Sequence, residues 1–328
     1  MTETANIPAL VLKKHLTIEE QLERLQSRGL LIEDWDYARK VISRLGYYRL
    51  SGYFYPLRKT KPVGEVGRKD AFVPSASFEL VAALADFDKG LRLIALDAIE
   101  TIEVATRVAL AHRLGKVDPE AHLRPELLDR KFTDIPRNST ARRPAISPYN
   151  EWLQRYDKAV SKSKDDFVKH HKKNYQGRMP IWVAIELWDF GMLSRFFSGM
   201  QQRDQNAVAQ SFGPLEGPVL ASWLRNFNFV RNVAAHHSRL WNRTNSDLPR
   251  LPLLESCRLL EPLHSPNVPV EKLFISLTCM RLLLKWVDPK STWNDKVKAH
   301  AKTFPKSELL SLDSAGFIDG WEDTPIWR

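Results

Sequence analysis

Residues 219–237 have the sequence VLASWLRNFNFVRNVAAHH, and their pattern is that of an amphipathic helix. Large apolar side chains recur every three or four residues, as they do along one face of an α-helix. They are Leu220, Trp223, Leu224, Phe227, Val230 and Ala234. The pattern predicts a helix from Val219 to about His237 that buries one face in a core.

The other side of this predicted helix carries polar side chains. At about 100° per residue, four of them share an arc of about 80°. They are Arg225, Asn228, Asn232 and His236. Arg231 lies at the border of this arc, beside the small Ala235. Two amides and an imidazole are therefore expected to line one groove, with a guanidinium at its edge.

These groups suit a metal-free cleavage of RNA, in which the 2′-hydroxyl of the substrate is the nucleophile. An imidazole can exchange a proton near neutral pH, and a guanidinium can hold phosphate oxygens and their developing charge. The same residues have a plainer interpretation. The pair His236-His237 at a helix end interacts favourably with the helix dipole, and Arg231-Asn232 can be ordinary polar surface. The spacing alone favours this second interpretation.

The composition is that of a soluble globular protein, with 43% hydrophobic and 27% charged residues. A length of 328 residues predicts about two domains, or one elaborated domain. Only 14 glycines are present, and the 20 prolines lie mainly between the apolar-periodic stretches. This distribution favours a mainly α fold over tightly turned sheets.

A net charge of +10 and a pI near 9.5 are consistent with a nucleic-acid partner. The excess is local, in residues 124–143 and in residues 155–178, which include Lys169, Lys172 and Lys173. A solvated surface explains the same charge runs equally well.

Capping patterns predict the first helices. Thr17 and Glu20 form a capping box before a short helix, and Asp34 can cap a second helix that ends at Gly46. From Ser77 the apolar period continues to about Leu114, as one helix or as two broken at Gly90. On this stretch Glu100, Glu103 and Arg107 have helical spacing, which favours a solvated salt-bridged face.

Other segments are predicted less sharply. Residues 59–71 and 116–148 read as surface loops, and residues 149–175 as one basic helix or two. The GxxG of residues 64–67 is too short to indicate an RNA clamp of the KH type. A helix is expected over 181–190 with Trp182, Ile185 and Trp188 on an apolar side. Another is expected over 271–287, followed by an irregular tail.

No segment indicates export or membrane insertion, so a cytoplasmic protein is expected. The apolar piece 8–12 is too short for a signal peptide, and charges interrupt the apolar stretch 91–114. Cys257 and Cys279 show neither disulfide nor zinc spacing and are expected in the core. Neither a metal nor a cofactor is predicted.

The string from Arg231 to Arg243, RNVAAHHSRLWNR, resembles the signature of the Abi-like (AbiD/AbiF-type) abortive-infection proteins, members of the HEPN superfamily. Ribonucleases of that superfamily carry Arg, four to six residues and then His. Segments elsewhere in the chain are similar to family segments in family order: LTIEEQ from Leu16, GYYRLSGY from Gly46, AIETIEVATR from Ala98 and PIWVAIEL from Pro180.

This resemblance implies an HEPN-type helical bundle with additional N-terminal and C-terminal helices, paired as a homodimer. It also implies an endoribonuclease of bacterial antiphage defence that leaves a 2′,3′-cyclic phosphate. Arg231 and His236 are then the motif pair, and Asn232 is the Asn that often follows the Arg. His237 belongs to the same string as a further catalytic candidate. Arg239, Asn242 and Arg243 are candidates for RNA binding, with Arg225, Asn228 and the three lysines above.

The expected domains are residues 1–76 and residues 77–328, the second with a basic insertion at 116–178. Two other functions stay open. The chain can be a non-catalytic RNA-binding defence protein or a toxin held inactive by a structured small RNA, since some HEPN domains bind RNA without cutting it. It can also be a toxin whose site accepts or carries a modified nucleotide.

Overall fold

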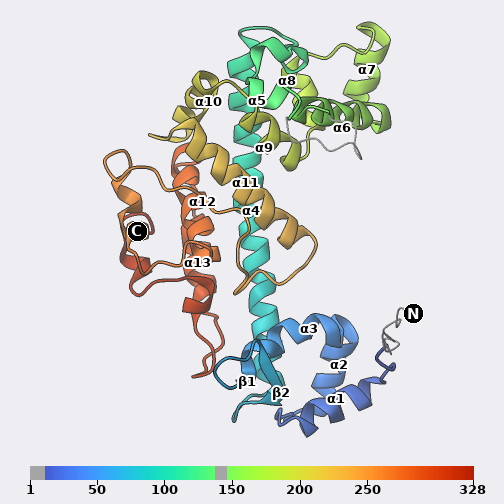
Figure 1. Cartoon of the computed structure of the whole chain (residues 1–328), viewed down its shortest axis with the longest axis vertical. Helices are drawn as coiled ribbons and strands as arrows, with labels where there is room; N and C mark the ends of the chain where they lie inside the picture. The colour runs from blue at the N-terminus through green and yellow to red at the C-terminus, as the bar shows by residue number, and fades with distance from the viewer. Residues whose placement is uncertain (1–11, 137–145) are drawn as a thin grey trace, which may run out of the picture. The chain divides into compact units, whose positions relative to one another are not determined.

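The structure is a computed structural model that describes residues 12–136 and 146–328 (Figure 1). It is mainly α-helical, as the sequence predicts. The described residues form two compact units. The first contains the residues up to Phe87 together with Pro305–Leu310, and the second contains Asp88–Phe304 together with Ser311–Arg328. Within the described part, no helix combines the length and the apolar character that a bilayer crossing requires.

The first unit begins with the helices that the capping patterns predict. In α1 (Ile18–Ser27) the hydroxyl of Thr17 accepts the amide of Glu20 at 3.2 Å, and the Glu20 carboxylate accepts the amide of Thr17 at 2.6 Å. Asp34 caps α2 (Trp35–Leu45). The aromatic run that follows forms α3 (Tyr47–Phe54), and Tyr53 and Phe54 are buried while Tyr48 is exposed.

The prediction of a plain loop over residues 59–71 is wrong. The segment forms an antiparallel hairpin of β1 (Arg58–Thr60) and β2 (Arg68–Phe72), in which Arg58 pairs with Phe72. Few apolar residues mark these strands, and Arg28 of α1 contributes to holding them through an ion pair with Asp70 at 2.8 Å. Tertiary contacts thus supply the order that the local sequence does not indicate.

The long helix α4 (Phe78–Gly115) is continuous and is not broken at Gly90. The glycine is explained by a close approach, because a Cβ at this position would lie 2.4 Å from Cε1 of His300. His300 belongs to α13 (Trp293–Ala301), a helix in the tail that the sequence predicts as irregular. The correction has a physical reason: α13 is held by long-range contacts, such as the bond from Nε1 of Trp293 to the carbonyl of Ile94 at 2.8 Å.

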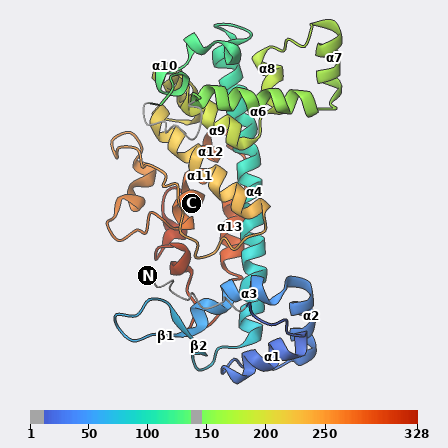
Figure 2. The ribbon, with the colours of Figure 1, turned by 45° about the vertical axis from the view of Figure 1, so that its right-hand side comes forward.

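The second unit is built around α11 (Gly217–Ala235), which lies beside α4 and α12 (Leu273–Val287) in both views (Figures 1 and 2). The helices α9 (Phe190–Ser198) and α10 (Gln202–Ala209) pack against it as well. All six side chains of the predicted apolar face of α11 are buried. The same helix also buries Ser222 and Asn226, two polar residues outside the predicted polar arc.

Residues 116–148 are more structured than the predicted surface connection. They contain η2 (Ala121–Leu123), η3 (Pro125–Leu127) and α5 (Arg130–Thr133). Their side chains His122, Leu128 and Phe132 are buried, which an exposed loop would not allow. The prediction of one or two helices over 149–175 is confirmed by α6 (Pro148–Lys162) and α7 (Asp166–Asn174). Residues 137–145 lie outside the described part.

The helix expected over 181–190 is short and ends early. It consists of α8 (Ile181–Ala184) and the 3-10 turn η4 (Ile185–Leu187). Ile185 and Trp188 are buried as predicted, but Trp182 is 52% exposed. The tighter 3-10 turn after Ala184 changes the direction of the later side chains, so the three residues do not share one buried side.

Buried rings from α6, α9 and η4 form an aromatic cluster, which encloses His122. The ring of Trp152 lies 4.8 Å from those of Trp188 and Phe196, and the His122 ring lies 5.3 Å from that of Tyr156. Neither ring nitrogen of His122 has a hydrogen-bond partner in the structure. Burial lowers the pKa of His122 to about 4, although Glu120 and Asp118 oppose the change.

The segment that follows α11 is fixed by a buried carboxylate on α4. The Asp88 oxygens accept the backbone amides of Leu240 at 3.1 Å and of Trp241 at 2.5 Å. Asp88 also pairs with Arg92 at 2.5 Å, and Arg92 donates to the carbonyl of Ser238 at 3.4 Å. Asp88 is fully buried. The end of α11 is therefore anchored to α4.

We expect His122 to make the protein less stable as the pH falls from 6.5 to about 4. In this window the unfolded chain binds a proton at His122 and the folded chain does not, so acid favours unfolding. A pKa lowered from 6.5 to about 4 corresponds to about 3 kcal/mol. Urea unfolding between pH 7 and pH 4 should show this loss in the wild type relative to His122→Phe. Parallel pH profiles for the two proteins would contradict the assignment.

We expect Asp88→Ala to lower the free energy of unfolding by about 3–5 kcal/mol, because it removes the buried carboxylate that binds Arg92 and two backbone amides. The matched control is Asp86→Ala on the same helix, which removes an exposed ion pair with Arg44 at 3.5 Å. That change should cost less than about 1 kcal/mol. Both variants are measured by chemical denaturation, and equal losses would show that Asp88 does not anchor the chain.

Candidate functional site

The helix α11 ends at the two histidines of the predicted motif. The amide of His237 donates to the carbonyl of Ala234, and the amide of Ser238 donates to that of Val233, each at 3.0 Å. This pair of bonds is the Schellman motif, which places the residue after the C-cap in the left-handed region. His236 is the C-cap, and His237 has φ 55°, where glycine is usual. Both imidazoles are exposed.

Arg231 lies one turn before this end and is half-buried. Its Nη1 donates to Oδ1 of Asn232 at 3.3 Å. This contact joins the side chains of two consecutive residues and allows Asn232 to orient the guanidinium. The two residues and His236 together occupy the last turns of α11.

Behind Arg231 lies a network of charges that the sequence reading missed. Burial raises the pKa of Glu103 on α4, while Arg107 and Arg231 oppose that rise. Glu103 pairs with Arg107 at 2.5 Å, and Arg107 also pairs with Glu186 at 3.4 Å and donates to the carbonyl of Trp188 at 2.8 Å. The side chains of Glu103 and Arg107 are only 18% exposed. The predicted salt bridge on this face is thus present and Glu100 is exposed, but Glu103 and Arg107 are less solvated than their spacing predicts.

Asn228 faces the start of α9. A Cβ built on Gly191 would lie 3.4 Å from Oδ1 of Asn228 and 3.1 Å from Oδ1 of Asp189, so this glycine permits the close approach. Asp189 caps α9 and pairs with Arg155 at 2.9 Å. Asn228 is therefore placed against a helix start, where a positioning role is the plainer one.

The remaining residues of the motif string spread over the exit of α11. Arg239 is half-buried and Arg243 is exposed. The Arg243 guanidinium lies 5.7 Å from the centre of the Phe229 ring, and Asn242, with φ 53°, accepts a hydrogen bond from Lys272 at 3.0 Å. These contacts close the loop after the helix, and a role of these residues in RNA binding stays a prediction.

The other predicted RNA-binding residues lie elsewhere. Arg225 is exposed and its Nη1 donates to the hydroxyl of Ser198 at 3.4 Å. Lys169, Lys172 and Lys173 are exposed on α7, which lies apart from the C-terminal end of α11 in both views (Figures 1 and 2). Of the basic segment 124–143, residues 137–143 lie outside the described part.

The arrangement offers an exposed imidazole at a helix end, a guanidinium one turn earlier and a buried carboxylate behind that guanidinium. This set can exchange a proton and bind an anion. Across residues 12–136 and 146–328, no group of three or more His, Cys, Asp and Glu side chains is placed to hold a metal ion.

Comparison with known proteins places the chain in a family. No curated protein and no solved structure matches it significantly. The model of the family described as Abi-like protein matches residues 40–242, which is more than half of the chain and includes both Arg231 and His236. The resemblance to Abi-like proteins is thereby confirmed, while the HEPN relationship stays a prediction. The protein belongs to the Abi-like protein family.

Proposed function

We propose that the protein is a metal-independent endoribonuclease of abortive infection, in which His236 moves the proton and Arg231 holds the scissile phosphate. Family membership supports the defence role. The ribonuclease assignment depends on one observation: both side chains lie at the same, solvent-reachable end of α11.

In the proposed reaction, the imidazole of His236 accepts the proton of the substrate 2′-hydroxyl. The resulting oxygen attacks phosphorus, and the bond to the 5′-oxygen of the next nucleotide breaks. The 5′-oxygen leaves with a proton from an acid, for which exposed His237 and water are the available sources. The products are a 2′,3′-cyclic phosphate and a 5′-hydroxyl end. Arg231 offers two donors to the phosphate oxygens while charge develops on them.

A second copy of the chain is part of this proposal. Two Arg231–His236 pairs facing each other would place four cationic or proton-transferring groups around one phosphodiester. The exposure of His236 and the partial exposure of Arg231 leave both available for such a composite site.

Non-catalytic RNA binding is the second candidate function. It is favoured by the exposed lysines of α7, which lie apart from the Arg231–His236 pair. Of these, Lys169 pairs with Asp166 at 2.8 Å and Lys172 donates to the Val160 carbonyl at 3.1 Å. A structured regulatory RNA bound there can hold the nuclease inactive, so the two functions are compatible.

We expect His236→Ala to slow RNA cleavage by at least about a hundredfold, because it removes the general base. The assay incubates purified wild-type and variant proteins with total cellular RNA in EDTA and then determines the chemistry of the product ends. Wild-type products should carry cyclic phosphates.

Two matched variants sharpen this assay. His237→Ala changes the neighbouring exposed imidazole, and Arg203→Gln changes an exposed arginine on α10 that is not among the predicted site residues. We expect Arg203→Gln to cleave like the wild type, while the rate of His237→Ala reports whether it supplies the leaving-group proton. Wild-type activity in His236→Ala would overturn the mechanism. If no protein cuts and one defined RNA co-purifies with all of them, RNA binding replaces catalysis as the proposed function.

A further inference from the structure

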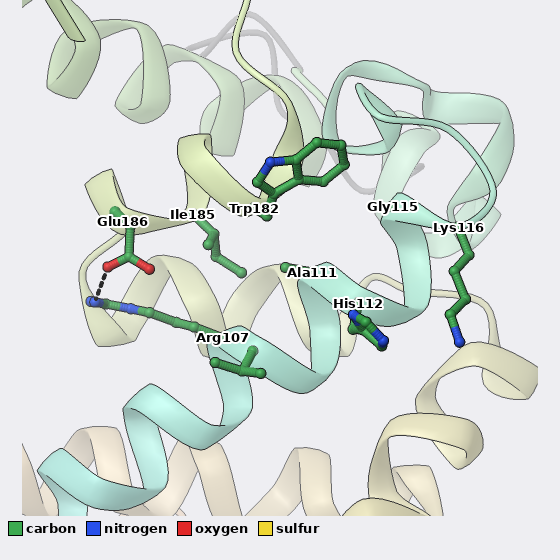
Figure 3. Close-up of a pocket in the computed structure, with 9 residues that line it drawn as sticks. Arg107, Ala111, His112, Gly115, Lys116, Trp182, Ile185 and Glu186 are labelled. Atoms are coloured by element: carbon green, nitrogen blue, oxygen red, sulfur yellow. Dashed lines mark hydrogen bonds and ion pairs between the residues drawn. The ribbon is translucent and has the colours of Figure 1, made fainter. Parts of the chain in front are cut away.

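A cavity of about 330 Å³ opens between α4 and the segment formed by α8 and η4 (Figure 3). Its inner surface is apolar and its rim is polar. The apolar lining residues are Val108, Ala111, Trp182 and Ile185. The rim residues are Arg107, His112, Lys116 and Glu186. Its volume lies at the lower end of the range of small-molecule pockets, about 300–1,000 Å³.

The indole of Trp182 forms one wall of this cavity. The neighbouring indoles of Trp152 and Trp188 are buried, but Trp182 is 52% exposed. Its ring rests on the end of α4, because a Cβ on Gly115 would lie only 3.1 Å from its Cε3. Gly115 thus lets a flat aromatic surface lie at the mouth of the cavity.

The rim has a positive end and a neutral end. At the neutral end the Arg107 guanidinium is balanced by Glu186 (Figure 3). It also pairs with Glu103 on the same helix. At the other end Lys116 and His112 are exposed, and Lys116 forms no ion pair with the residues that the structure describes. An aromatic wall beside an unpaired cation matches the two parts of a nucleotide, its base and its phosphate.

The cavity is linked to the proposed active site through α4. Arg107 lines the cavity and pairs with Glu103, and Glu103 lies within the electrostatic range of Arg231. An RNA strand that reaches Arg231 can therefore place a neighbouring nucleotide against the same helix.

We propose that this cavity is a subsite for one unpaired nucleotide of a single-stranded RNA, with its base stacked on Trp182 and its phosphate beside Lys116. The proposal rests on the proposed RNA-cleaving function and names the form of RNA that it takes. A base inside a duplex is already stacked and cannot enter, whereas an unstacked base can stack on an exposed aromatic ring.

Charge favours an anionic occupant for this cavity. The chain carries a net charge of +10, so a polyanion such as RNA is attracted to it. Lys116 on the rim contributes a further positive charge to the same cavity that Trp182 lines.

The test measures binding of a fluorescein-labelled single-stranded RNA of mixed sequence by fluorescence anisotropy, in EDTA. The full chain carries His236→Ala so that no substrate is consumed. We expect Trp182→Ala to weaken binding about tenfold, since one base loses its stacking partner. Trp182→Phe should retain most of the affinity. Binding of a duplex RNA of the same length should be unaffected by either change.

Two further variants separate stacking from charge and from general damage. Trp286→Ala removes another tryptophan that is also 52% exposed, on α12, and should bind RNA like its parent. Lys116→Gln should make the dependence of log K on log salt shallower by about 0.7, the value for one phosphate contact on a single strand.

The outcomes distinguish the two proposals. Equal affinity of Trp182→Ala and its parent for single-stranded RNA overturns the subsite and leaves the nuclease proposal standing. If the wild type neither cuts nor binds RNA, both proposals fall. If Trp182→Ala instead converts a dimer to a monomer in sedimentation velocity, the surface joins two copies of the chain and the subsite is overturned.

Discussion

A buried carboxylate cannot keep its charge inside a protein unless donors replace the water that it loses. Asp88 meets this requirement with two backbone amides beyond α11 and with Arg92 on its own helix. The consequence is geometric. The chain that leaves α11 has to return to α4 within a few residues of His236, and the Schellman turn at His237 is the local means by which it does so. The position of the candidate imidazoles thus depends on an acid that is distant in sequence.

Glu103 and Arg107, the charged groups near Arg231, also need partners where they are shielded from water. Glu103 is costly to ionise where it is buried, and its pKa is raised accordingly. Arg107 supplies it with a short ion pair and is itself held by Glu186 and by the carbonyl of Trp188. The Nη atoms of Arg107 thereby connect α4 to η4 and to the residue that follows η4. The charged groups near Arg231 therefore have these contacts before a substrate binds.

Local signals predict local structure well in this chain. The capping box at Thr17, the cap at Asp34 and the apolar period of α11 depend on neighbours within one or two turns, and the structure confirms them. The β1–β2 hairpin, α13 and the exposure of Trp182 depend on distant contacts, which no window of sequence contains. For the site, spacing indicates the polar arc of α11. It cannot indicate that Glu103 lies behind Arg231, because helical spacing is equally consistent with a solvated face.

A guanidinium near a carboxylate is partly neutralised, which at first sight argues against its use for binding phosphate. The network on α4 answers this objection. Glu103 forms its ion pair with Arg107, and burial raises the pKa of Glu103. It therefore attracts the Arg231 guanidinium less strongly than a solvated carboxylate would. A phosphate can accept two parallel bonds from the guanidinium, which are stronger than a single longer-range attraction. In the proposed reaction, the Arg231 guanidinium therefore stays available to the substrate phosphate.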